Sequence, residues 1–187
     1  MLLATQGGPV ARQKSGAMLM HHIARGLPGL AAALFLAAAQ PAGASDRGIE
    51  IVDYGVYDHT VTQVIPEPKD VAGERSTVAN IRLREKTDII DAQRSRMFGY
   101  QFRVTDPALY GKTLTTRKIV PKLTNPTSGR SATTVEGEVI AGPDTLFLNA
   151  YGFDYDWERA EGEWTFQVLL DGKVLAEKKF KVILPMN

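Results

Sequence analysis

Residues 164–184 read WTFQVLLDGKVLAEKKFKVIL, and on both sides of Asp171-Gly172 the apolar side chains fall on even positions. This period of two predicts a pair of strands that bury one face. A two-residue turn at Asp171-Gly172 would place Phe166 opposite Glu177, whereas a three-residue loop would place Phe166 opposite Ala176. The common parity therefore favours a hairpin with a three-residue loop. We expect its buried side chains to be those of Trp164, Phe166, Val168, Phe180 and Val182.

The other apolar stretches after Ser45 are short, rich in β-branched and aromatic residues, and bounded by Gly, Pro, Asn or Asp, as strands usually are. Together with the hairpin they predict strands at 49–57, 77–85, 97–105, 113–120, 133–140, 145–153, 164–170 and 174–184. Only residues 88–93 indicate a helical turn. Two long loops rich in Pro, Gly, Ser and Thr, at 66–76 and 121–131, are the segments where a binding surface would most easily form. The pattern predicts an all-β fold, an antiparallel β-sandwich of roughly eight strands.

The first 44 residues differ in kind from the rest, because they contain no acidic side chain. Arg25 precedes an apolar run at 27–39, which is shorter than the roughly 20 residues that a membrane-spanning helix needs. The small residues Ala42-Gly43-Ala44 then form a signal-peptidase site before Ser45. We therefore expect a cleaved signal peptide at 1–44, a single domain at 45–187, and a periplasmic or secreted bacterial protein with no membrane anchor after cleavage.

Composition argues against several classes of function. Removing the leader takes away three of the 22 basic residues and none of the 21 acidic ones, which leaves a net charge of −2 and no basic footprint for nucleic acid. The chain has no cysteine, so thiol catalysis, thiolate metal sites and disulfides are excluded. Phosphate-loop and dinucleotide-binding motifs are absent from the sequence, and no cofactor is indicated.

Three segments resemble a known family. They are Ile51–Tyr57 near the mature start, the strand Trp164–Val168, and the stretch from Leu175 to Val182. Together they look like an uncharacterised bacterial exported family, the domain of unknown function 3859, which is immunoglobulin-like in appearance. The resemblance implies an immunoglobulin-like sandwich without the paired cysteines of antibody domains. Its motifs are core and turn residues, so it implies nothing about chemistry.

Residues 153–158 carry the most suggestive polar pattern of the chain. If they continue a strand, Asp154, Asp156 and Glu158 share one face, and three carboxylates in a row could hold Ca²⁺. A solvated strand edge would show the same pattern. The opposite face would carry aromatic side chains, and Tyr151, Tyr155 and Trp157 are our candidates for a platform that binds a sugar ring or a peptide. Such a stripe also occurs in cores, and Gly152 could mark a bulge that exchanges the two faces.

Catalytic residue types are scarce. His59 is the only histidine after the leader, and its setting in Asp58-His59-Thr60 is typical of a solvated turn. A solvated face is also the ordinary explanation for a set of basic residues spread among acids: Arg94, Arg96, Lys112, Arg117, Lys118 and Lys122.

These observations favour a non-catalytic exported module that binds an unknown protein or glycan. Two alternatives remain open. One is an exported hydrolase acting on glycans through Asp154 and Asp156, because alternating strand residues stand about 7 Å apart. The other is a calcium-dependent structural domain. A pocket that gathers the aspartates would favour the enzyme, and a flat sheet face would favour the binding module.

Overall fold

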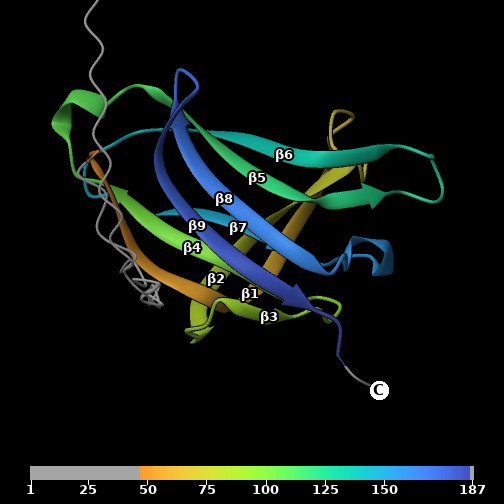
Figure 1. The fold of residues 1–187 in the computed structure, drawn as a ribbon. Coiled ribbons are helices and arrows are strands. Elements are labelled where there is room, and N and C mark those ends of the chain that lie inside the picture. Colours follow the sequence, from red (N-terminus) through yellow and green to blue (C-terminus); the bar gives the residue numbers. More distant parts are fainter. Residues whose placement is uncertain (1–46, 186–187) are drawn as a thin grey trace, which may run out of the picture. The chain divides into compact units, whose positions relative to one another are not determined.

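Two β-sheets packed face to face make up the chain between residues 47 and 185, which are the residues that the computed structural model describes (Figure 1). The strands of this part are β1 (Ile49–Pro66), β2 (Glu74–Glu85), β3 (Ile89–Asp91), β4 (Met97–Val104), β5 (Thr113–Thr124), β6 (Ser131–Ile140), β7 (Phe147–Gly152), β8 (Gly162–Leu170) and β9 (Lys173–Ile183). Sheet A has the order β2-β1-β4-β7, and sheet B has the order β3-β9-β8-β5-β6. The predicted all-β sandwich is confirmed, whereas the leader at 1–44 lies outside the described residues.

The core is aromatic and lies between β4 of sheet A and β8 and β9 of sheet B. The ring of Phe98 is its centre, with centroid distances of 5.2–5.5 Å to four other buried rings. Those rings belong to Phe153, Trp164, Phe166 and Phe180. The five residues predicted to be buried in the hairpin are all at most 1% exposed, so their burial is confirmed. The prediction that only one face is buried was wrong for β8, because Thr165, Gln167 and Leu169 on its other face are buried too.

The turn of this hairpin is not the predicted one. Asp171 and Gly172 form a two-residue turn, with Leu170 paired to Lys173 and positive φ angles of 49° and 78° at the turn residues. A register shift between Val168 and Leu169 then restores the parity, so that even positions face even positions further along the strands. Phe166 consequently pairs with Lys178 and not with Ala176. The predicted three-residue loop was wrong. The turn has two residues, and the bulge restores the pairing of even positions with even positions that the longer loop would have given.

A second difference concerns residues 88–93, which do not form a helical turn. Residues 89–91 are strand β3, paired in parallel with β9 through Ile89–Lys181 and Asp91–Ile183. Ile90, on this strand, is fully buried. The segment is too short and too strongly β-branched to form a stable helix, and the free edge of β9 gives its backbone hydrogen-bond partners.

The long β1–β2 hairpin brings the two sheets together on one side. Strand β1 pairs with β4 through its first half and with β2 through its second half, so the predicted loop at 66–76 shrinks to residues 67–73. This short loop contacts the loop after β5: Asn125 donates to the carbonyl of Val71 at 3.1 Å, and Arg130 donates to the carbonyl of Lys69 at 3.0 Å. The hairpin of sheet A therefore covers the β5–β6 hairpin of sheet B.

Glycine is required where β4 and β7 approach each other most closely. A Cβ atom at Gly99 would lie 2.2 Å from the carbonyl oxygen of Asn149 and 2.6 Å from the Cα of Ala150. Both are backbone atoms, so the clash could be relieved only by moving a strand. Among residues 47–185, no helix is long and apolar enough to cross a membrane.

Candidate functional site

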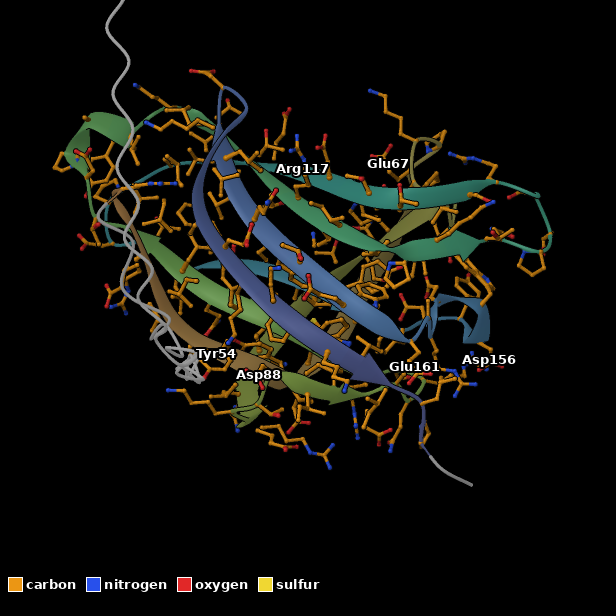
Figure 2. All side chains as sticks on the ribbon, in the orientation of Figure 1. Tyr54, Glu67, Asp88, Arg117, Asp156 and Glu161 are labelled. Atoms are coloured by element: carbon orange, nitrogen blue, oxygen red, sulfur yellow. The ribbon has the colours of Figure 1, made fainter. Side chains whose placement is uncertain are left out.

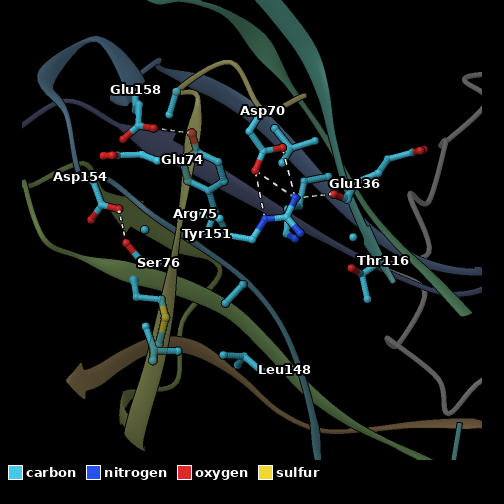
Figure 3. Close-up of a pocket in the computed structure, with 18 of the residues that line it drawn as sticks. Asp70, Glu74, Arg75, Ser76, Thr116, Glu136, Leu148, Tyr151, Asp154 and Glu158 are labelled. Carbon is cyan, nitrogen blue, oxygen red and sulfur yellow. Dashed lines mark hydrogen bonds and ion pairs between the residues drawn. The ribbon is translucent and has the colours of Figure 1, made fainter. Parts of the chain in front are cut away.

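A pocket of about 310 Å³ lies between the sheets, under the β1–β2 hairpin (Figure 3). Its walls come from β1, β2 and β7 of sheet A, from β5 and β6 of sheet B, and from the segment after β7. This volume is at the lower end of the range of small-molecule sites, roughly 300–1,000 Å³. The sandwich therefore offers a site for a small ligand under the β1–β2 hairpin.

Arg75 forms an ion pair with Asp70 and a hydrogen bond that links the two sheets. Arg75 donates to both carboxylate oxygens of Asp70, at 3.0 and 3.1 Å, and also to the carbonyl of Glu136 at 3.0 Å. Asp70 and Arg75 belong to the β1–β2 hairpin and Glu136 to β6, so the guanidinium group holds sheet A against sheet B. A bidentate arginine–carboxylate pair has fixed geometry, so this wall of the pocket is well ordered.

Lys118 is the most unusual group in the pocket. It stands on the inward face of β5, between the buried Thr116 and Val120, and is only 9% exposed. In the described part of the chain its ammonium group makes no hydrogen bond or ion pair. Burial, and to a lesser degree the positive charge of Arg75, lowers the pKa of Lys118 to about 8, although Asp70 opposes this shift.

A second polar cluster closes the pocket at the end of β7. Both carboxylate oxygens of Glu158 accept hydrogen bonds, one from the hydroxyl of Tyr151 at 2.9 Å and one from the backbone N–H of Tyr155 at 2.8 Å. Glu158 is 4% exposed, and burial raises its pKa although these two hydrogen bonds lower it in part. Burial also raises the pKa of Tyr151, with Glu158 contributing. This cluster anchors the short 3₁₀ turn η2 (Asp156–Glu158).

The segment after Gly152 is not a strand, so the predicted alternation at 153–158 was wrong. β7 ends at Gly152, Phe153 turns into the core, and η2 follows. Gly152 pairs with Met97 as the last residue of a regular ladder, so it does not mark a bulge. Burial of the Phe153 ring against Phe98 stabilises the fold more than continuing β7 as an edge strand would.

The three candidate metal ligands consequently have different partners. Asp154 accepts from the hydroxyl of Ser76 at 3.3 Å, and Asp156 pairs with Arg159 at 3.0 Å. Glu158 binds the two tyrosines described above. Figure 2 places Asp156 on η2, and Figure 3 places Asp154 and Glu158 at the pocket. In the region 47–185, no group of three or more His, Cys, Asp or Glu side chains is arranged to hold a metal ion.

The three candidate aromatic residues also separate. Tyr155 and Trp157 stack with ring centroids 5.7 Å apart and an interplanar angle of 13°, and the hydroxyl of Tyr155 donates to Glu74. Tyr151 instead packs edge-to-face on the buried Trp164, with centroids 5.0 Å apart. Tyr151 and Tyr155 line the pocket, but Trp157 does not. Four of the six predicted site residues thus meet at one pocket: Tyr151, Asp154, Tyr155 and Glu158.

The residues that the sequence interpretation missed lie on the opposite wall. Lys118 was assigned to a solvated face, which the structure contradicts. Its position was readable, because Leu114, Thr116, Lys118 and Val120 share a parity and the apolar members of this row face inward. His59 was expected in a turn, but it lies within β1 and lines the pocket.

These features define a class of protein. It is a β-sandwich without disulfides that carries a polar pocket between its sheets. Comparison with solved structures agrees on the fold. An immunoglobulin-like protein from Pseudomonas aeruginosa matches with a TM-score of 0.54 and 21% identity, covering 75% of this chain and all of that one. The likeness identifies the fold as immunoglobulin-like.

The family can also be stated. Residues 45–182 match the model of the family described as "Domain of unknown function (DUF3859)", and the chain belongs to this family. No curated protein matches the chain. The resemblance found in the sequence is therefore confirmed.

Proposed function

We propose that this immunoglobulin-like domain is a non-catalytic, exported binding module that takes a small, uncharged ligand into the pocket between its sheets. The pocket itself carries the proposal. It is concave, it draws polar side chains from both sheets, and a cross-sheet hydrogen bond from Arg75 holds it in shape. Export is supported by the acid-free leader and the Ala42-Gly43-Ala44 site.

The lining chemistry supports a neutral, hydroxyl-rich or carbonyl-bearing ligand. Six acidic side chains line the pocket, against one arginine and one lysine, so an anionic ligand would meet a repulsive field. Those residues are Asp70, Glu74, Glu136, Glu138, Asp154 and Glu158 against Arg75 and Lys118. Tyr155, which is 38% exposed at the rim, offers a ring face of the kind on which sugars and planar groups stack. A single sugar unit of a glycan partner fits these properties.

A thermal-shift screen with small sugars, alcohols, amides and aldehydes tests the proposal, because a ligand that binds only the native state raises the melting temperature. Val135→Trp places a large side chain in the pocket and should abolish the shift. Ile140→Trp is the matched control, since Ile140 lies on the same strand but is 70% exposed and outside the pocket. A shift that survives Val135→Trp would place the ligand elsewhere.

One observation favours a second function, hydrolysis of a glycan. Glu158, whose pKa is raised by burial, and the exposed Asp154 line the same pocket, and two carboxyl groups in one pocket are the residue pair that glycosidases use. Against it, both oxygens of Glu158 already accept hydrogen bonds. Release of nitrophenol from nitrophenyl glycosides that is lost in both Glu158→Gln and Asp154→Asn would establish the enzyme and displace the binding module.

A further inference from the structure

Lys118 lines the pocket, and within residues 47–185 no side chain forms a hydrogen bond or ion pair with its amine. An ammonium group inside a protein normally pairs with a carboxylate, because an unpaired buried charge is costly. Here Asp70, the carboxylate that acts on Lys118, is already bound by two hydrogen bonds from Arg75. Lys118 also lines the cavity, so its amine lies where a ligand in the pocket could reach it.

The charged groups around Lys118 come from every element that packs on the pocket. Asp70, Glu74 and Arg75 belong to the β1–β2 hairpin, Glu136 and Glu138 to β6, and Asp154 and Glu158 to the segment after β7, with His59, Tyr151 and Tyr155 as the other titratable residues of the lining. Burial and Arg75 dominate and bring the pKa of Lys118 to about 8. At pH 7 about one tenth of such an amine is neutral, against roughly one in three thousand for an ordinary lysine.

We propose that Lys118 captures a small aldehyde in the pocket as a reversible Schiff base. The inference rests on the proposed function, because it assumes that this pocket receives the ligand. An aldehyde suits the site better than an anion, since it is uncharged and does not meet repulsion from the acidic lining. A nucleophilic lysine in a desolvated pocket is the arrangement that Schiff-base chemistry requires.

The step is balanced without an oxidant or a reductant. The lone pair of the neutral Nζ attacks the carbonyl carbon, and the carbonyl oxygen takes up a proton while Nζ loses one, which gives a carbinolamine. Loss of one water molecule then forms the C=N bond. Thr116 lies two residues away on the same inward face of β5, so its hydroxyl can donate a hydrogen bond within the pocket as the oxygen leaves.

Reductive trapping tests this inference. The purified protein is incubated at pH 7 with limiting butyraldehyde and sodium cyanoborohydride, which turns an imine into a stable secondary amine, and each lysine is followed by peptide mass spectrometry. Lys118 should react about tenfold faster or more than Lys122, an exposed lysine on the same strand. Val135→Trp should slow labelling of Lys118, and Ile140→Trp should not.

The outcomes separate this inference from the proposed function. Amide chemical shifts are recorded for the same protein with butyraldehyde but without reductant. Labelling of Lys118 no faster than Lys122, with shifts at the pocket residues, would overturn the Schiff base and leave the pocket as a binding site. If Lys118 is not labelled and no amide shifts change, the pocket does not capture aldehydes in any form, and the inference is overturned. Preferential labelling of Lys118 that Val135→Trp suppresses would establish it.

Discussion

Replacing Lys118 by methionine is expected to raise the free energy of unfolding at pH 7. The fall of the Lys118 pKa from 10.5 to about 8 on folding corresponds to about 3 kcal/mol, at about 1.4 kcal/mol for each tenfold change in proton affinity. Methionine has a similar length and an adaptable shape, and it removes the charge that burial penalises. Lys122→Met, at an exposed position of the same strand, is the matched control and should change stability little.

The pH dependence of the free energy of unfolding tests the direction of this effect. Because the folded-state pKa of Lys118 is lowered, the unfolded state binds more protons between about pH 8 and pH 10.5, so stability rises with pH in this window. From pH 7 to pH 9.5 the wild type should gain about 2 kcal/mol relative to Lys118→Met. Burial raises the pKa of Tyr57, Tyr100 and Tyr151, which costs stability above about pH 10, so the series ends below that value.

Urea unfolding followed by tryptophan fluorescence at each pH gives both quantities, since the fully buried Trp164 reports on the core. The result that would refute the reasoning is a constant difference between wild type and Lys118→Met over the whole pH range. A less stable Lys118→Met at pH 7 would be equally damaging, because it would mean that the ammonium group has a partner in the folded protein.

Three further predictions concern the core, metal and processing. Phe180→Ala should cost about 3–5 kcal/mol, because Phe180 is 1% exposed and packs on Phe98 and Phe166, while Gln167→Ala, which loses a hydrogen bond to Glu177, should cost well under half as much. Equal urea midpoints for the two variants would contradict the core parity. Thermal melts in chelator and in millimolar Ca²⁺ should coincide, since Asp154, Asp156 and Glu158 have separate partners, and a rise of several degrees with Ca²⁺ would reveal a site. Mass spectrometry of the exported protein should find Ser45 at the N-terminus, and a soluble folded form that begins at Met1 would exclude the predicted cleavage.

The buried residues of the hairpin could be predicted from the sequence because the pleat of a strand ties every second side chain to one face. Trp164, Phe166 and Phe180 follow this rule without exception. The turn could not be predicted in the same way, because a bulge at Val168 and Leu169 changes the register by one residue and leaves no mark in the parity of the apolar positions.

The candidate site was predictable only in part, for a different reason. Residues 151–158 were found because carboxylates and aromatic rings cluster in the sequence itself. Their partners come from distant strands: Tyr155 meets Glu74, and Asp154 meets Ser76. These contacts depend on where the β1–β2 hairpin places β2 relative to the segment after β7, and this arrangement has no local signal in the sequence.

The most direct test of the proposed binding site is a map of backbone amide chemical shifts during titration with a compound that raises the melting temperature. If the pocket between the sheets is the binding site, the largest changes fall on its lining, at Thr116, Lys118, Gly137 and Tyr151. Changes concentrated instead at Val64 and Ile65, which are exposed on β1 outside the pocket, would contradict the account and assign binding to the surface of the β1–β2 hairpin.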